Sequence, residues 1–254
     1  MNPVADVRFP AAIVSPRLIN VSVSDLELDQ KGASVFIDHE VPQVKFVDRT
    51  FNCKHSHSMA IWTYLKEHDR GKTNFHFEVA ADLLNEEEME LIASMRPGLI
   101  QLEIGIQSTN PETITEIRRK MNFEEVKRIV KRVQEKGNVH QHLDLIAGLP
   151  YEDYERFAQS FRDVYALHPE QLQLGFLKVL KGSYMHEKTE DYQLLYRDRP
   201  PFEVLSTKWL SYDDVIRLKG VEEMVEVYYN SGQFVNTLQL LEEEFTDTFA
   251  LYEV

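Results

Sequence analysis

Two histidines and an aspartate, His140, His142 and Asp144, stand at every second position of the stretch VHQHLDLIA. Successive side chains of a β-strand point to opposite faces, so these three groups share one face of a strand and the leucines occupy the other. Imidazoles two apart on a strand can share a metal ion, with the carboxylate as a further ligand. The stretch is therefore one wall of a candidate site for metal or proton-transfer chemistry.

A second stretch, LIQLEIGIQ, alternates in the same way and places Glu103 and Gln107 on one face, opposite a row of leucines and isoleucines. The stretch NFHFEVA does the same with His76 and Glu78. Glu103 and Asp144 can be interpreted as the acid/base pair of a hydrolase. Carboxylates on such a face are equally suited to recognising hydroxyl, amine or amide groups of a ligand.

Strand-like runs alternate with amphipathic helices from about residue 26 onward, which is typical of a parallel sheet with crossover helices. The predicted strands span 43–48, 74–80, 99–107, 139–147 and 172–179. The clearest helices are predicted at 123–136 and 151–168. Strands that helices cover on both faces are normally apolar throughout. These strands each have one polar face instead.

A sheet with a polar face needs a particular architecture, because each buried polar group without a partner costs about 1–3 kcal/mol. A curved sheet with helices outside and a polar lumen inside avoids that cost. We therefore predict an α/β fold with a complete or partial β/α barrel whose lumen holds polar ligands or chemistry. The alternative is an exposed sheet with one solvated face.

Composition narrows the classes of protein and partner. Acidic residues outnumber basic ones by 42 to 28, which disfavours binding to nucleic acid or to an anionic membrane. No apolar run approaches the roughly 20 residues of a membrane span, and the N-terminus lacks the charged start of a secretory signal. These features predict a cytoplasmic protein that binds small molecules.

The single cysteine, Cys53, excludes an internal disulfide and a metal site made only of cysteines. It is interpreted as a loop or packing residue. His55 and His57 follow it at the expected start of a helix, where a solvated cap region explains them. No metal ligand is predicted, although a metal-dependent hydrolase built on His140, His142 and Asp144 is kept as an alternative.

Five of these blocks together resemble one family. VKFVDRTFN, FHFEVAADLL, LEIGIQSTNPETI, HLDLIAGLPYEDYERF and LQLGFLKVLKGS are similar, in order, to the strand-and-loop blocks of radical S-adenosylmethionine (SAM) enzymes. The resemblance is specifically to the subgroup with an N-terminal cobalamin-binding domain and a C-terminal domain of unknown function. The resemblance covers about residues 26–254 and implies a partial six-stranded β/α barrel, with SAM and a 4Fe-4S cluster as cofactors and cobalamin in the full-length family.

The resemblance also implies which residues contact the cofactor. It places Glu103, Gln107 and Ser108 where SAM is bound after the fourth strand. The same resemblance places Asp144 on the fifth strand, and Asp48 and Asn52 at the top of the second. The catalytic residues stay unassigned.

The chain departs from the family in its first part. The cluster of radical SAM enzymes is held by a CxxxCxxC motif after the first strand, and this sequence contains neither the motif nor a recognisable first strand or cobalamin domain. The expected parts are an aberrant segment at 1–25, a partial barrel at 26–183 that lacks its first strand, and a small, mostly helical domain at 184–254, with RDRPP at 197–201 as a linker.

The aberrant segment has an explanation at the level of codons. When plausible codons for residues 6–14 are read one nucleotide out of register, they spell CPFSCSYC. The three cysteines require codons that begin with GT or GC at set positions, and Val7, Ala11 and Val14 supply them. We interpret the segment as a frameshifted translation of the cluster loop; the alternative is an unrelated N-terminal arm.

The chain is thus predicted to descend from an enzyme that cleaves SAM reductively and to lack that activity as written. The alternatives are a non-catalytic fragment that binds SAM or a partner, and the metal-dependent hydrolase above. Loss of the first strand is expected to leave the strand at 43–48 with an unpaired edge, which favours self-association.

Overall fold

The computed structural model describes residues 5–6, 26–245 and 247–253. The described residues divide into two compact units. The first comprises the residues up to Gly105 together with Glu124–His142, and the second comprises Ile106–Phe123 and the residues from Leu143 onward. Among the described residues, no helix combines the length and the apolar character that crossing a membrane requires.

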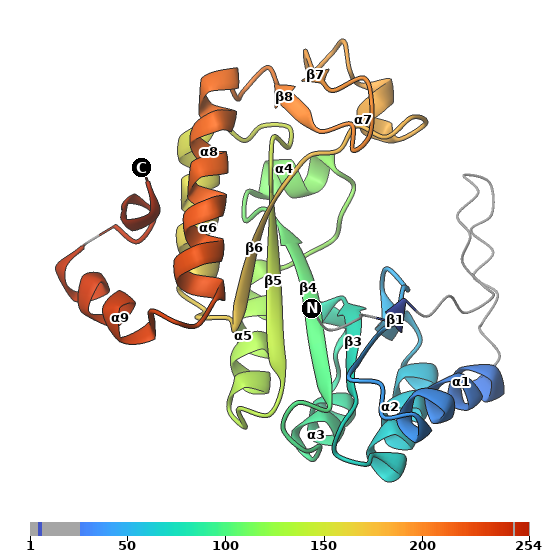
Figure 1. Ribbon diagram of the computed structural model, residues 1–254. Helices are drawn as coiled ribbons and strands as arrows, with labels where there is room; N and C mark the ends of the chain where they lie inside the picture. The colour runs from blue at the N-terminus through green and yellow to red at the C-terminus, as the bar shows by residue number, and fades with distance from the viewer. Residues whose placement is uncertain (1–4, 7–25, 246, 254) are drawn as a thin grey trace. The chain divides into compact units, whose positions relative to one another are not determined.

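The first unit is built of short parallel strands and the helices that follow them (Figure 1). Its strands are β1 (Ala5–Asp6), β2 (Gln43–Lys45) and β3 (Asn74–Val79), with most of β4 (Ile100–Gln107) and the first residues of β5 (His140–Ala147). Its helices are α1 (Leu26–Asp38), η1 (Phe51–Cys53), α2 (His55–His68), η2 (Ala81–Leu83), α3 (Glu86–Ala93) and nearly all of α5 (Phe123–Gln134).

Strand pairing follows the order of the chain. The sheet order is β1-β2-β3-β4-β5-β6, and the first four strands pair in parallel. In this register Lys45 lies opposite His76, and His76 lies opposite Gln101. Parallel neighbours that are also consecutive in sequence require a crossover helix between them, which α2, α3 and α5 provide.

The two faces of the sheet in this unit differ in the way that the alternation predicts. Phe75, Phe77 and the even-numbered residues of β4 are buried and apolar. On β5 the Gln141 side chain is fully buried, and its Nε2 donates to the backbone oxygen of Val130 in α5, 3.1 Å away. Gln141 therefore faces the helices, which leaves the neighbouring His140 and His142 on the opposite, polar face.

Asparagine and glutamate side chains fix the helices of the first unit. Asn85 caps α3 with a complete capping box, in which its side chain accepts from the Glu88 backbone and the Glu88 carboxylate accepts from the Asn85 backbone. The same buried Glu88 accepts from Ser58 and contacts His55 Nδ1 at 2.9 Å, which ties α2 to α3. Asn138 donates to the carbonyls of Ile92 and Met95 at the end of α3.

The second unit contains the carboxyl ends of β4 and β5, followed by the C-terminal elements. These elements are α4 (Pro111–Glu116), α6 (Tyr154–Tyr165), β6 (Gln171–Phe176), α7 (Tyr184–Glu187), β7 (Leu195–Tyr196), β8 (Val204–Ser206), α8 (Tyr212–Met224), a π-helical turn η3 (Val225–Asn230), α9 (Val235–Glu244) and η4 (Ala250–Tyr252). Aromatic side chains of α6 and the chain end, among them Phe161 and Phe249, pack edge to face. The expected small, mostly helical C-terminal appendage is confirmed.

Three expectations need correction. The first strand is present as the two residues of β1, which pair with Val44 and Lys45, so β2 is not an open edge. The stretch RDRPP is not a linker, because it forms the turn between β7 and β8, where the Arg197 backbone donates to Glu203. β2 is also half as long as expected. The segment 7–25, for which a frameshifted cluster loop is predicted, lies outside the described residues.

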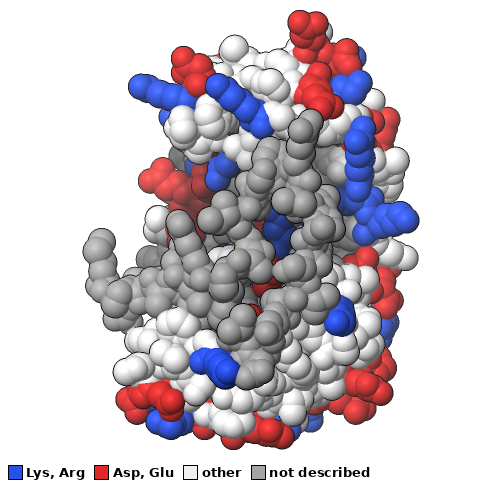
Figure 2. Space-filling model, turned by 90° about the vertical axis from the view of Figure 1, so that its right-hand side faces the viewer, with Lys and Arg blue, Asp and Glu red and all other residues white. Residues whose placement is uncertain are grey.

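Charged side chains of both signs are interspersed on the described part of the face in Figure 2. In this view the described lysines and arginines do not merge into one broad basic patch. The full sequence carries a net charge of −14. The expectation that nucleic acids are not ligands of this chain stays a prediction.

Candidate functional site

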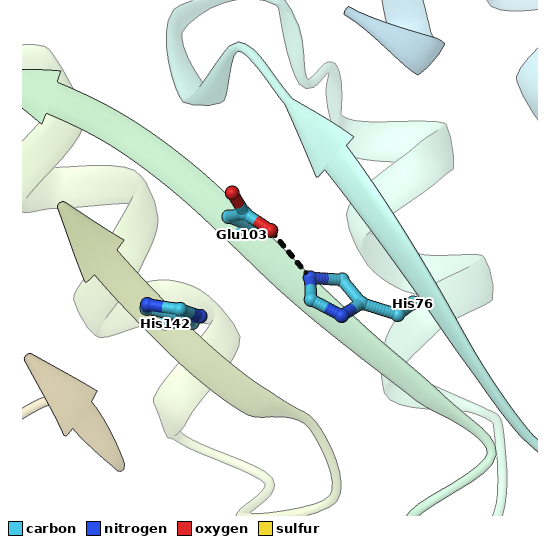
Figure 3. A group of neighbouring side chains, drawn as sticks. All are labelled: His76, Glu103 and His142. Carbon is cyan, nitrogen blue, oxygen red and sulfur yellow. Dashed lines mark ion pairs between the residues drawn. The ribbon is translucent and has the colours of Figure 1, made fainter. Parts of the chain in front are cut away.

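Four polar side chains meet on the polar face of the first unit, one from each of four neighbouring strands. They are Lys45 of β2, His76 of β3, Glu103 of β4 and His142 of β5. Figure 3 shows the His76 ring directed at the Glu103 carboxylate from one side, with His142 on the adjoining strand. Parallel pairing positions them, because neighbouring strands carry these residues at similar heights on the same face.

Glu103 is the centre of the group. Its Oε2 lies 2.8 Å from His76 Nε2 and 2.7 Å from Lys45 Nζ. The two imidazoles are nearly buried, with 8% of His76 and 6% of His142 exposed, and their ring centroids are 6.3 Å apart. The Lys45 side chain is 38% exposed. The site is thus a partly buried carboxylate with two nearly buried imidazoles beside it and a lysine that reaches in from solvent.

The surroundings stabilise the charged form of Glu103. The hydrogen bond from His76 lowers the pKa of this carboxyl most, and Lys45 lowers it further by a hydrogen bond and by its charge. Burial acts in the opposite direction. The net effect brings the pKa of Glu103 to about 2, so the carboxylate is ionised throughout the neutral range.

Two predicted cofactor contacts of the first unit lie elsewhere. Asp48 follows β2 and is exposed. Asn52 is fully buried in η1, and its amide is engaged twice with the backbone of Ala80, donating at 2.9 Å and accepting at 3.0 Å. This contact joins η1 to the end of β3. The predicted roles of Asp48 and Asn52 toward SAM stay predictions.

In the second unit, Ser108 belongs to a buried cluster directly after β4. Its hydroxyl donates to Glu152 Oε1 at 2.6 Å, and Ser160 of α6 donates to the same oxygen at 2.9 Å. The Ser108 oxygen also accepts from the backbone of Asn110 at 3.0 Å. Burial raises the pKa of Glu152 to about 7, although both serine hydrogen bonds lower it in part.

Gln107, the last residue of β4, has the backbone in the left-handed region, with φ of 71°. Such a conformation is uncommon for a residue other than glycine and costs about 1–2 kcal/mol. The side-chain oxygen of Gln107 is buried, and it has no hydrogen-bond partner among the described residues. A strained residue with an unsatisfied acceptor at the carboxyl end of a strand is suited to meeting a polar ligand.

The histidines that come together are not those of the metal-dependent hydrolase that the sequence suggests as an alternative. Among the described residues, the set able to share an ion is His76, Glu103 and His142, and neither His140 nor Asp144 belongs to it. His55 and His57, considered as a pair in the sequence, instead contact separate carboxylates: His55 contacts Glu88, and His57 contacts a buried aspartate.

Sequence reasoning missed Lys45 and Glu152, and it did not predict that His76 meets Glu103. The alternation in NFHFEVA placed His76 on the polar face, but its proximity to Glu103 depends on register between strands. Lys45 is the last residue of a three-residue strand, too short for its alternation to be informative. Glu152 stands in a loop before α6 and carries no periodic signal.

Comparison with known proteins agrees with this architecture. Residues 30–164 match the model of the Radical SAM superfamily, and residues 190–254 match that of a protein family of unknown function, DUF4080. The oxygen-independent coproporphyrinogen III oxidase of Paracoccus denitrificans (strain Pd 1222) is 32% identical over 100 residues, which are 39% of this chain and 22% of that protein. The chain thus spans less than a quarter of the length of this relative.

Solved structures share the fold. Coproporphyrinogen III oxidase (HemN) from Escherichia coli, a radical SAM enzyme, superimposes with a TM-score of 0.55 at 16% identity, over 80% of this chain and 46% of that one. The radical SAM methyltransferase TsrM from Kitasatospora setae, with cobalamin and a [4Fe-4S] cluster bound, superimposes with a TM-score of 0.55 at 15% identity. The match covers 74% of this chain and 38% of that one.

The fold is an α/β partial barrel of the radical SAM type, as predicted. This chain belongs to the Radical SAM superfamily, because the family model matches more than half of it. The cofactors of that family are SAM and a 4Fe-4S cluster.

The residues of this chain do not fit the cluster. Such clusters are held by cysteine thiolates, and the 254 residues include one cysteine, Cys53, which is exposed in η1. One thiolate cannot replace the three of the family motif. The unsatisfied, buried oxygen of Gln107, in contrast, fits a polar ligand such as SAM at the end of β4.

Proposed function

We propose that this 254-residue chain is a radical SAM barrel that does not hold the 4Fe-4S cluster and therefore does not cleave SAM reductively. The observation that carries the proposal is the presence of a single, exposed cysteine in a chain of this family. The cluster supplies the electron for SAM cleavage when it is bound. A chain without its ligands keeps the scaffold and lacks that step.

The position of β1 supports the frameshift as the origin of this loss. In the family the cluster loop follows the first strand. Here β1 ends at Asp6 beside β2, and the first cysteine of the shifted reading falls at position 7. The shifted motif would thus begin directly after a strand that pairs where the first barrel strand belongs.

We further propose that the chain still binds SAM through the side chains on the polar face and at the carboxyl ends of its strands, which are called the SAM wall below. The supporting observation is the buried oxygen of Gln107, which has no hydrogen-bond partner among the described residues. By the family resemblance, the residues assigned to SAM are Asp48, Asn52, Glu103, Gln107, Ser108 and Asp144. We also propose that the chain belongs to the cobalamin-binding subgroup and is located in the cytoplasm. We place the boundary between the barrel and the C-terminal domain at residue 183.

The cluster proposal is tested by anaerobic reconstitution with iron and sulfide, followed by measurement of bound iron and of visible absorbance. The purified chain is expected to retain no stoichiometric iron that depends on sulfide. The matched control replaces residues 7–14 by CPFSCSYC and is expected to gain iron and sulfide together. Stoichiometric, sulfide-dependent iron in the unmodified chain would overturn the proposal.

Retention of the SAM wall is tested separately by calorimetric titration with SAM. We expect a binding isotherm that weakens when Gln107 is replaced by leucine, because the leucine removes the acceptor at nearly constant volume. Gln233→Leu, an exposed position, serves as the control. Absence of binding by the folded, unmodified chain would contradict a retained wall without affecting the cluster result.

A further inference from the structure

The donor atoms of His76, Glu103 and His142 converge on the polar face of the first unit. One nitrogen from each histidine and one oxygen from Glu103 all lie within 4.8 Å of one another. The three residues come from β3, β4 and β5, so Glu103 lies on the strand between the two histidines (Figure 3). Glu103 is also among the residues that the family resemblance assigns to SAM, whereas His76 and His142 are not.

We propose that His76, Glu103 and His142 form a binding site for a divalent transition-metal ion of the Zn²⁺, Fe²⁺ or Mn²⁺ type. Two imidazoles and one carboxylate are the donor set that such ions accept. Mg²⁺ and Ca²⁺ prefer sites made of oxygen ligands and are disfavoured by two nitrogen donors. Three protein ligands leave at least one position of the ion open to water or to a ligand.

The distances are compatible with closure around an ion. Metal bonds of about 2.0–2.2 Å in a tetrahedral site bring neighbouring donor atoms to roughly 3.3–3.5 Å from each other. The donor atoms that lie farthest apart, within 4.8 Å, must therefore approach by up to about 1.5 Å, whereas His76 Nε2 and Glu103 Oε2, 2.8 Å apart, must separate by about 0.5 Å. Rotation of the side chains supplies a movement of this size, and the strands that carry them need not move.

Lys45 competes with the ion for the Glu103 carboxylate. Its ammonium group contacts the same Glu103 oxygen that His76 contacts, so it is the local counter-charge of the carboxylate. A dication at this position would repel the ammonium group strongly. Because the Lys45 side chain is 38% exposed, it can turn into solvent when the ion enters. Metal binding and the ion pair between Lys45 and Glu103 are therefore expected to compete.

This competition gives the proposal an unusual signature. Removal of a merely structural lysine from a partly buried carboxylate destabilises the site. In a metal site the same removal takes away the competitor of the ion. The variant Lys45→Met is thus expected to bind the metal more tightly than the unmodified chain, by about tenfold or more if the ion pair contributes about 1.4 kcal/mol.

The experiment is a titration of the untagged 254-residue chain with Co²⁺ alone, because its visible bands report the coordination geometry, followed by displacement with Zn²⁺. We expect one Co²⁺ per chain with ligand-field bands of a nitrogen and oxygen site. A thiolate charge-transfer band would reveal binding at Cys53 instead, and the Cys53→Ser variant removes that route. One-to-one binding that depends on Cys53 would overturn the proposal.

Variants of the ligands identify the site. His142→Ala and Glu103→Gln are each expected to weaken Co²⁺ binding by more than about 10–100-fold, the range that loss of an outer-shell partner alone produces. The matched control is His140→Ala, two positions earlier on the same face of β5, which should bind like the unmodified chain. Circular dichroism confirms that each variant is folded.

The outcomes separate the interpretations. Weakening by His142→Ala and Glu103→Gln together with tightening by Lys45→Met supports the site. Equal weakening by His140→Ala would assign the ion to another group of side chains and overturn it. Because Lys45 is partly exposed, its variant is expected to fold even where a ligand variant does not, and unchanged or weaker binding by Lys45→Met would also contradict the proposal.

Discussion

Ser108 donates a hydrogen bond of 2.6 Å to a carboxylate that is almost wholly removed from water, that of Glu152. The residue following β4 is thereby tied to the loop before α6 in the second unit. Ser160 donates to the same oxygen, whereas the other oxygen of Glu152 has no partner among the described residues. The carboxyl group is therefore only half satisfied.

This environment predicts a stability that depends on pH. The pKa of Glu152 is about 7 in the folded chain and near 4.5 when unfolded, so the folded state binds the proton more tightly. Its stabilising contribution is fully present below about pH 4.5 and is lost as pH rises through about 7, at a cost of about 3 kcal/mol.

The variant Glu152→Gln removes the titrating group while keeping an oxygen that accepts from both serines. Denaturant unfolding between pH 5 and 8 is expected to show a smaller loss of stability in the variant than in the unmodified chain. Glu155→Gln, an exposed neighbour in α6, is the control. Identical pH profiles of the Glu152 variant and the unmodified chain would contradict the assignment.

Asn138 is expected to stabilise the first unit through hydrogen bonds of its side chain. Its side chain donates to the carbonyls of Ile92 and Met95 at 2.8 and 3.1 Å, where α3 ends. Asn138→Ala leaves these carbonyls without that donor in a buried place and is expected to lower the free energy of unfolding by about 1–3 kcal/mol. Asn236→Ala, exposed in α9, should change it by less than about 0.5 kcal/mol. Thermal and urea unfolding measure both.

Replacement by alanine is expected to change the stability in opposite directions at Gly148 and at Gly220. The φ of Gly148 is 86°, and a Cβ atom there would lie 2.8 Å from Val204 Cγ1. Gly148→Ala is expected to cost about 2–4 kcal/mol, from the backbone and from the clash. Gly220 in α8 has nothing within 4 Å of a Cβ position, so Gly220→Ala is expected to stabilise by up to about 1 kcal/mol.

A second substitution separates the steric and the backbone contributions to the stability loss of Gly148→Ala. Val204→Ala removes the atom that clashes, so the double variant should recover the steric part of the loss and retain the backbone part. A Gly148→Ala chain as stable as the unmodified one would contradict the strained conformation.

The amide of Asn230 covers the backbone of β6. It accepts from the Leu172 N–H and donates to the Leu172 carbonyl, both at 2.9 Å, as a neighbouring strand would. Asn230→Ala removes the side-chain partner of the Leu172 N–H and of the Leu172 carbonyl. It is expected to lower the free energy of unfolding by about 1–3 kcal/mol. It also opens a strand edge. Sedimentation velocity should detect more self-association than in Gln233→Ala, and equal behaviour of the two variants would refute this role.

Much of the fold could be predicted from the sequence, because alternation along a strand is a local property. The period of two placed Glu103, His76 and His142 on polar faces, and the structure confirms the partial barrel that these faces require. The length of β2 could not be predicted, since QVKFVD is strand-like for six residues and the strand comprises only Gln43–Lys45. The roles assigned to Gln107, Ser108 and Asp144 toward SAM stay predictions.

The candidate metal site shows where local information ends. His140, His142 and Asp144 are neighbours on one strand, yet the ligands that converge come from three strands separated by 27 and 39 residues along the chain. Only the parallel register of β3 against β4 brings His76 to Glu103. The sequence by itself determined the family and the lack of cluster cysteines, since residue types and their order carry both. Tertiary structure decided which polar side chains meet, because distances across a sheet depend on pairing that no single strand encodes.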